Sequence, residues 1–122
     1  MSVTNWKERA AQLKLNGQAF INGRRVDAVS GATFDCISPC NGQKLTDVAR
    51  CDKADVDIAV KAAREAFEDG RWSHLSPRKR KEILIRFADL IVECKNELAL
   101  TETLDMGKPI SNALAVDVAS AQ

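Results

Sequence analysis

The sequence predicts a mixed α/β protein in which short β-hairpins come first and three to four α-helices follow. Asn22-Gly23 separates two short segments, and Asn-Gly is the strongest two-residue hairpin signal because both positions tolerate positive φ. From Asp52 onward the apolar spacing changes to three and four residues, the period of a helix with one buried face. We therefore place a β-hairpin region at residues 19–50 and a helical region at residues 52–122 of a single domain.

The overall composition excludes some classes of partner. The chain has 122 residues, of which 45% are hydrophobic and 29% charged, as in ordinary globular proteins. Its 18 basic and 17 acidic residues give no charge excess that would attract nucleic acid or an anionic membrane. No apolar run approaches the ~20 residues of a membrane span. We expect neither nucleic acid nor a membrane as partner.

The N-terminal residues and the cysteines indicate a compartment. Charged residues interrupt positions 1–15, so no secretory apolar segment is present there. We therefore expect the cytoplasm, where the four cysteines stay reduced and free.

The hairpin region is preceded by one short helix. Thr4 is its expected cap and Asn16-Gly17 its expected end, with Trp6 and Leu13 sharing one face. Turn residues then delimit four short extended segments. The expected strands are residues 19–21, 24–26, 33–37 and 45–50.

Start and stop residues delimit the helices. Asp52 caps the first helix of this region, and Gly70 ends it. Ser76 and Pro77 start the next helix, because proline is favoured at the first helical position. A further run over 97–106 stops at Gly107. Ser111 is the expected cap of a last helix, residues 112–121, which shows no stop signal.

The helices carry more apolar surface than the hairpins can cover. Ile83, Phe87 and Leu90 form one stripe, and burying each such side chain is worth ~1.5–3 kcal/mol. The strands are short and partly polar. We therefore expect this chain to be part of a larger core.

Composition and spacing do not name a reaction. Cys36, Cys40, Cys51, Cys94 and His74 lack the two close pairs of a zinc site, so free thiols are the favoured interpretation. No cysteine has the local signature of a nucleophile. Gly-rich phosphate motifs are absent from the sequence.

Two charged features leave alternatives open. The basic cluster at residues 78–81 could contact phosphate, but a solvated helix face or salt bridges to a neighbour are favoured. Asp105 lies at a helix C-terminus, where the helix dipole disfavours an anion. It is either a solvated acid or an acid stabilised there by a cation or a basic partner.

Five segments agree in order and spacing with motifs of a known family. They are residues 20–23 (FING), 34–39 (FDCISP), 55–67 (DVDIAVKAAREAF), 88–91 (ADLI) and 102–109 (ETLDMGKP). Together they resemble the N-terminal segment of NAD(P)-dependent aldehyde dehydrogenases. Within that family, residues 70–73 and 76–80 look most like enzymes that oxidise amino- and γ-glutamylamino-aldehydes in polyamine breakdown.

The resemblance implies a longer enzyme with a Rossmann-like cofactor domain, to which residues 1–122 would contribute the N-terminal part. Such enzymes use NAD or NADP and form dimers or tetramers. A cysteine thiolate attacks the aldehyde, a hydride passes to the cofactor, and an activated water releases the acid. None of the family's catalytic or cofactor-binding residues matches a position here, so we expect the chain alone to be inactive.

One family site does map onto the chain. Many members hold a monovalent cation, K+ or Na+, with backbone carbonyls and one carboxylate. The matching positions are the carbonyl oxygens of Cys36 and Ile37 and the carboxylate of Asp105. Oxygen ligands suit a hard cation. The alternative to the whole enzyme interpretation is a free-standing, non-catalytic helical interaction module.

Overall fold

The computed structural model describes residues 5–121, which divide into two compact units. The first unit holds the described residues up to Leu15, then Cys36–Leu45, and the chain from Phe87 onward. The second holds residues 16–35 and 46–86. Among residues 5–121, no helix combines the length and apolar character that a membrane span requires.

The second unit contains the predicted Asn-Gly hairpin. β1 (Ala19–Ile21) pairs antiparallel with β2 (Arg24–Val26), and Ala19 lies opposite Val26. Asn22 and Gly23 have φ of 51° and 74°, the left-handed conformation that a two-residue hairpin turn requires. This element of the prediction is confirmed.

A second hairpin follows. β3 (Thr33–Ile37) pairs with β4 (Lys44–Ala49), which begins and ends one residue earlier than predicted. The Arg50 amide still donates to the Ala32 carbonyl at 2.8 Å, so the hydrogen bonding reaches the predicted boundary.

Gly17 has a different role from the predicted helix stop. It forms a parallel bridge with Val48, and a Cβ at this position would lie 2.0 Å from the Asp47 carbonyl oxygen. Only glycine permits so close an approach of two backbones. The helix expected to end at Asn16-Gly17 ends earlier, at Gln12.

Helix α2 (Lys53–Glu68) begins as predicted at Asp52. The Asp52 side chain accepts a hydrogen bond from the Ala54 amide at 2.8 Å. The Asp55 carboxylate accepts from the Asp52 amide at 2.9 Å, which completes a capping box. The same carboxylate accepts from the Val29 amide at 2.8 Å, so it also ties the loop after β2 to the helix start.

The first unit begins with α1 (Trp6–Gln12). Its cap is Asn5, whose side chain accepts from the Glu8 amide at 3.3 Å. The predicted cap, Thr4, lies outside the described residues. Helix α4 (Lys95–Met106) ends at Gly107, which adopts a left-handed φ of 73°, as the sequence predicted.

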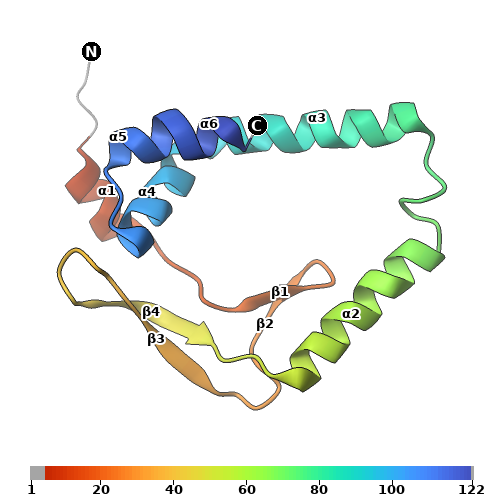
Figure 1. Cartoon of the computed structure of the whole chain (residues 1–122), viewed down its shortest axis with the longest axis horizontal. Coiled ribbons are helices and arrows are strands. Elements are labelled where there is room, and N and C mark those ends of the chain that lie inside the picture. The colour runs from red at the N-terminus through yellow and green to blue at the C-terminus, as the bar shows by residue number, and fades with distance from the viewer. Residues whose placement is uncertain (1–4, 122) are drawn as a thin grey trace. The chain divides into compact units, whose positions relative to one another are not determined.

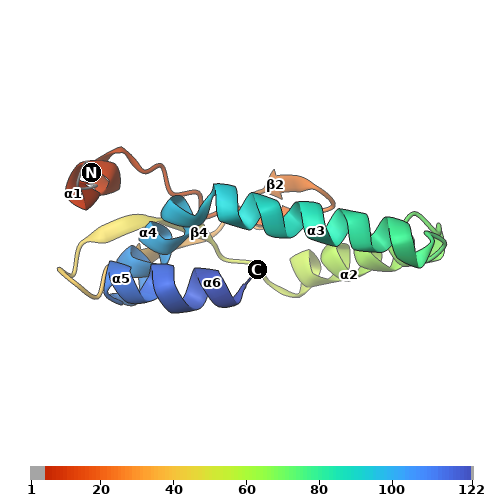
Figure 2. The same cartoon turned by 90° about the horizontal axis from the view of Figure 1, so that it is seen from above.

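The C-terminal helical segment differs from its prediction. It begins at Ile110 after an extended Pro109, so Ser111 lies inside the first turn and is not the cap. The segment runs through α5 (Ile110–Asn112), the π-helical η1 (Ala113–Asp117) and α6 (Val118–Ser120). It lies against α4, as both views show (Figures 1 and 2).

The buried core is small. In the first unit Ala99 and Ala113 are fully buried between α4 and the C-terminal segment, with Val118 beside them. No large side chain among the described residues is fully buried. Helix α3 (Pro77–Glu93) has no fully buried residue, although Ile91 is partly buried against this core. The apolar faces that the sequence predicts for α2 and α3 are therefore left uncovered by the described chain.

Candidate functional site

The end of β3 and the end of α4 meet in the first unit. The thiol of Cys36, half-buried on β3, donates to Oδ1 of Asp105 on α4 at 3.0 Å. Pro39 in the turn after β3 packs against Gly107 at the end of α4. A Cβ added at Gly107 would lie 3.0 Å from Cγ of Pro39. Two segments far apart in sequence thus form one junction.

Asp105 changes the chemistry of Cys36. The hydrogen bond to Asp105, then burial and the negative charge of that carboxylate, raise the pKa of the Cys36 thiol. The thiol stays protonated at neutral pH and acts as a hydrogen-bond donor. This environment is the opposite of the one that activates a nucleophilic cysteine.

The predicted cation ligands lie at this junction. Cys36 and Asp105 are in contact, and Ile37 follows Cys36 as the last residue of β3. The donors expected from these residues are carboxylate and carbonyl oxygens, which suit a hard cation. The C-terminal end of α4 adds the negative end of its dipole. The residues present therefore fit a monovalent cation.

The described residues do not form a transition-metal site. The described residues include no group of three or more His, Cys, Asp or Glu placed to hold a metal ion. The free thiols Cys36, Cys40, Cys51 and Cys94 are not joined by disulfides.

Sequence reasoning missed the contact that Asp105 makes. It offered a solvated acid, a cation or a basic partner, whereas the structure places a thiol donor beside the carboxylate. Cys36 is 69 residues away in sequence, and neither residue carries a local signal for the other. Only the packing of β3 on α4 reveals the pair.

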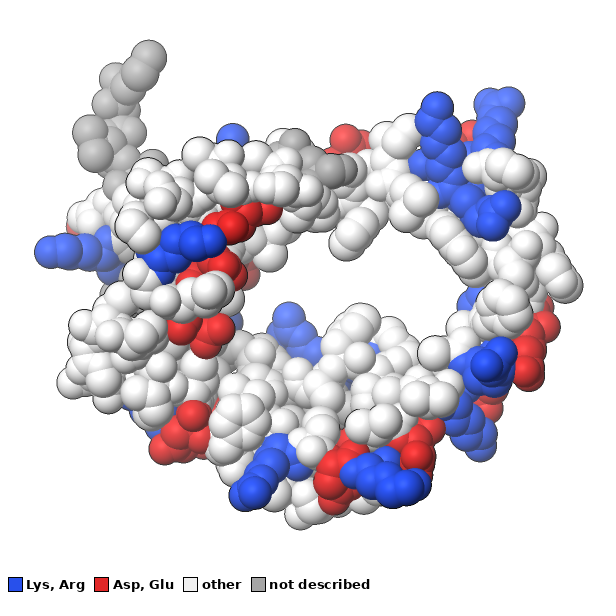
Figure 3. All heavy atoms as spheres, viewed as in Figure 1, with Lys and Arg blue, Asp and Glu red and all other residues white. Residues whose placement is uncertain are grey.

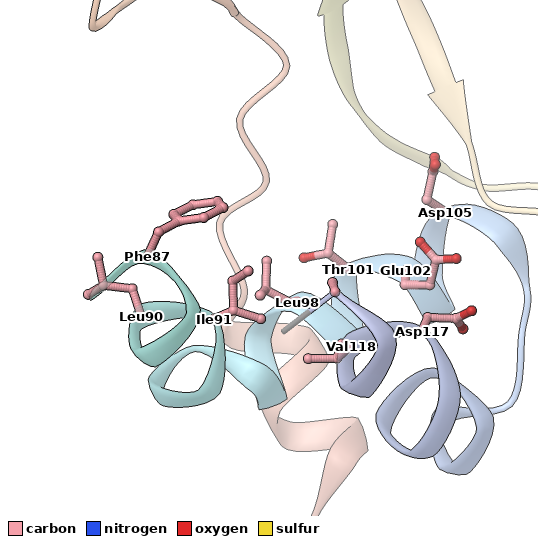
Figure 4. Close-up of a pocket in the computed structure, with 10 residues that line it drawn as sticks. Phe87, Leu90, Ile91, Leu98, Thr101, Glu102, Asp105, Asp117 and Val118 are labelled. Atoms are coloured by element: carbon pink, nitrogen blue, oxygen red, sulfur yellow. The ribbon is translucent and has the colours of Figure 1, made fainter. Parts of the chain in front are cut away.

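The first unit also has an apolar groove of about 590 Å³ (Figure 4). Phe87, Leu90 and Ile91 of α3 line one side of it. Leu98 of α4 and Val118 of α6 line the rest of the apolar part.

The other end of the groove is acidic. Glu102, Asp105 and Asp117 lie there, as Figure 4 shows. Asp117 is paired with Lys108, whose Nζ lies 2.6 Å from Oδ2 of Asp117. Glu102 is half-buried, and its side chain makes no hydrogen bond or ion pair within the part of the chain that the structure describes.

The first two residues of the basic cluster at residues 78–81 pair with Glu82 on the same helix. Arg78 Nε lies 3.0 Å and Lys79 Nζ 3.6 Å from the carboxylate of Glu82. Lys and Arg side chains project outward where α3 begins (Figure 3). Exposed pairs within one helix contribute little to stability.

Comparisons with a family pattern and with solved structures agree with one another. Residues 26–122 match the sequence pattern of the aldehyde dehydrogenase family. The aldehyde dehydrogenase KauB of Pseudomonas aeruginosa is 59% identical, with a TM-score of 0.94 over 96% of this chain and 24% of KauB.

Two other solved structures are similarly close. Indole-3-acetaldehyde dehydrogenase AldA of P. syringae, solved with NAD+ and IAA, is 56% identical, with a TM-score of 0.93 over 94% of this chain and 23% of that protein. Gamma-glutamyl-gamma-aminobutyraldehyde dehydrogenase of Burkholderia cenocepacia J2315 is 51% identical, with a TM-score of 0.94 over 96% of this chain and 24% of that protein.

The chain thus spans about a quarter of the length of these solved relatives and corresponds to the N-terminal portion of their fold. Because the family pattern covers most of the sequence and the backbones agree along nearly all of it, this chain belongs to the aldehyde dehydrogenase family.

Proposed function

We propose that this chain forms the N-terminal part of the cofactor-binding domain of an aldehyde dehydrogenase. The enzyme would oxidise an aldehyde to the carboxylic acid, reducing NAD+ or NADP+. The observation that carries the proposal is the match to KauB at 59% identity over 96% of the chain. A free-standing interaction module is not favoured, because such a module would need no backbone match to a catalytic protein.

The residues present indicate which catalytic and cofactor-binding groups this chain does not supply. The Cys36 thiol is held protonated by Asp105, and no motif in the chain provides a nucleophile or a phosphate-binding loop. In this proposal the nucleophilic cysteine, the water-activating carboxylate and the cofactor-binding glycines come from polypeptide outside these residues. The 122-residue segment shapes and supports the domain that holds them.

The substrate class proposed is an amino- or γ-glutamylamino-aldehyde of polyamine breakdown. The B. cenocepacia relative, named for γ-glutamyl-γ-aminobutyraldehyde, supports this class. The P. syringae relative was solved with NAD+, which supports a nicotinamide cofactor. We propose a homo-oligomeric enzyme. The four free thiols favour a reducing compartment such as the cytoplasm.

We also propose that Asp105 and the carbonyls of Cys36 and Ile37 hold K+ or Na+. The fit of the donors and the end of α4 support this. The test compares melting temperatures in KCl and in tetramethylammonium chloride at equal ionic strength. K+ should raise the melting temperature of the wild type and leave that of Asp105→Asn unchanged. An equal response of both proteins would contradict the site.

The function itself is tested with a chimera. This chain replaces the matching N-terminal part of the B. cenocepacia enzyme, and NAD+ reduction is followed at 340 nm with γ-glutamyl-γ-aminobutyraldehyde and 3-aminopropanal. We expect the chimera to turn over and the 122-residue chain alone to show no activity. A folded but inactive chimera, or turnover by the chain alone, would overturn the proposal.

A further inference from the structure

We infer that the groove lined by Phe87, Leu90, Leu98 and Glu102 is the docking site for another segment of the aldehyde dehydrogenase polypeptide, outside these 122 residues. That segment presents apolar side chains to the groove and a basic side chain to Glu102. This inference rests on the proposed function, because it takes its occupant from the rest of that enzyme.

The apolar side chains of the groove are more exposed than expected for the solvent-facing surface of a complete domain. Phe87 is 61%, Leu98 43% and Leu90 40% exposed, although they come from two helices and converge on one hollow (Figure 4). Contiguous apolar surface of this kind marks a site that another surface covers. Burial by an apolar partner therefore favours association here.

The groove is a formed surface and not a set of loose side chains. Ala99 and Ala113 are completely buried where α4 meets the C-terminal segment, and Ile91 packs against them. Small residues at this contact let the two helical segments approach closely. The groove walls are therefore fixed by packing within the first unit.

Glu102 indicates what the partner carries at the acidic end. The neighbouring carboxylates have partners, since Asp105 accepts from Cys36 and Asp117 pairs with Lys108. Glu102 is half-buried beside them and has no partner within the described residues. Covering a carboxylate in an apolar groove removes its hydration and costs free energy, unless a cation or a hydrogen-bond donor pairs with it. A lysine or arginine of the docking segment would meet that need.

The length of the relatives identifies the occupant. The chain corresponds to the N-terminal portion of proteins about four times longer, so most of their remaining polypeptide follows this portion. Ala121 at the end of the C-terminal helical segment also lines the groove. A second copy of this chain fits less well, because a two-fold contact would set one hollow against another.

Cysteine accessibility tests the inference without disturbing the fold strongly. Leu98→Cys places a thiol in the groove, and Ser111→Cys places one on an exposed polar position of the same unit. Each variant is made in the isolated chain and in the chimera with the B. cenocepacia enzyme. Labelling by a bulky maleimide is followed by mass spectrometry of tryptic peptides. We expect Leu98→Cys to react at least twentyfold more slowly in the chimera, and Ser111→Cys to react at similar rates in both.

The outcomes separate the inference from the function. An active chimera in which Leu98→Cys keeps the rate of the isolated chain overturns the docking site and leaves the proposed function standing. A folded but inactive chimera overturns the proposed function. Protection of Leu98→Cys in the isolated chain that grows with protein concentration assigns the groove to a second copy and overturns the inference.

Glu102→Gln tests the basic partner in the same chimera. The substitution keeps the side-chain shape and removes the charge. We expect a lower melting temperature than wild type at 50 mM NaCl, and a smaller difference at 500 mM NaCl because salt screens the lost pair. An unchanged melting temperature at both salt concentrations overturns the pairing of Glu102 with a base.

Discussion

Loss of the Asp55 carboxylate should be felt at a loop 26 residues away in sequence. It is almost fully buried, and hydrogen bonds from the Asp52 and Val29 amides lower its pKa. We expect Asp55→Asn to lower the thermal unfolding midpoint at pH 7, followed by circular dichroism. The amide of Val29 should also exchange its hydrogen several-fold faster, because the bond to a charged acceptor is lost.

The pH dependence of the Asp55 effect has a definite sign. A folded-state pKa below the unfolded value contributes stability that is complete above the unfolded pKa. That contribution is lost as pH falls through the folded pKa. The difference between wild type and Asp55→Asn should therefore be constant from pH 7 to 5 and vanish in strong acid. Asp57→Asn, an exposed carboxylate on the same helix, is the matched control.

The Cys36–Asp105 pair predicts a reactivity change. Because Asp105 raises the pKa of Cys36, little thiolate is present at pH 8 and alkylation by iodoacetamide is slow. Asp105→Asn should lower that pKa and speed alkylation of Cys36 several-fold, measured by peptide mass spectrometry. Cys94 serves as the internal control, and its rate should not change. Equal acceleration of both thiols would show a general loosening and not a local effect.

At the scale of elements, the glycine that ends α4 is under two constraints. Gly107 has φ of 73°, and a Cβ there would lie 3.0 Å from Pro39 Cγ. Gly42 of the same unit has φ of 70° with nothing within 4 Å of its Cβ position. Gly42→Ala should cost about 1–2 kcal/mol for the left-handed conformation alone. Gly107→Ala should cost more, measured by urea unfolding of the chimera. Equal losses would show that Pro39 moves aside freely.

The local signals of the elements were largely present in the sequence. Asp52, Ser76 and Gly107 mark boundaries by hydrogen-bonding or conformational properties that act within four residues, and the structure follows them. The errors have two causes. Gly17 serves a close approach to β4, a contact that is distant in sequence. At Ser111 the cause is local, because the amides of Asn112 and Ala113 donate to the Pro109 carbonyl and so place Ser111 inside the helix.

At the scale of the whole molecule, the uncovered apolar faces have a measurable consequence. Phe67 of α2 and Phe87 of α3 are more than half exposed, and Ile83 of α3 is 48% exposed, along faces with helical spacing. We expect the isolated chain to bind the dye ANS and to unfold over a broad temperature range. The chimera should bind little ANS and unfold cooperatively. A sharp two-state transition of the isolated chain without dye binding would contradict the proposed larger core.

The candidate cation site was foreseen only through family resemblance. Composition offered Asp105 as an acid in an unfavourable place at a helix end, but it gave no reason to pair this residue with the end of β3. The groove was not predicted at all, because its walls come from α3, α4 and the C-terminal helical segment, whose relative packing no local pattern specifies.

The sequence by itself determined the Asn-Gly turn, the helix boundaries at Asp52, Ser76 and Gly107, and the apolar faces, because caps, turns and periodicity are set by interactions within a few residues. Tertiary structure alone decided that Cys36 reaches Asp105 and that Asp55 holds the loop at Val29. It also decided that the Glu102 side chain has no partner among residues 5–121 beside an apolar groove. Those features depend on which segments pack together, and packing is a property of the whole fold.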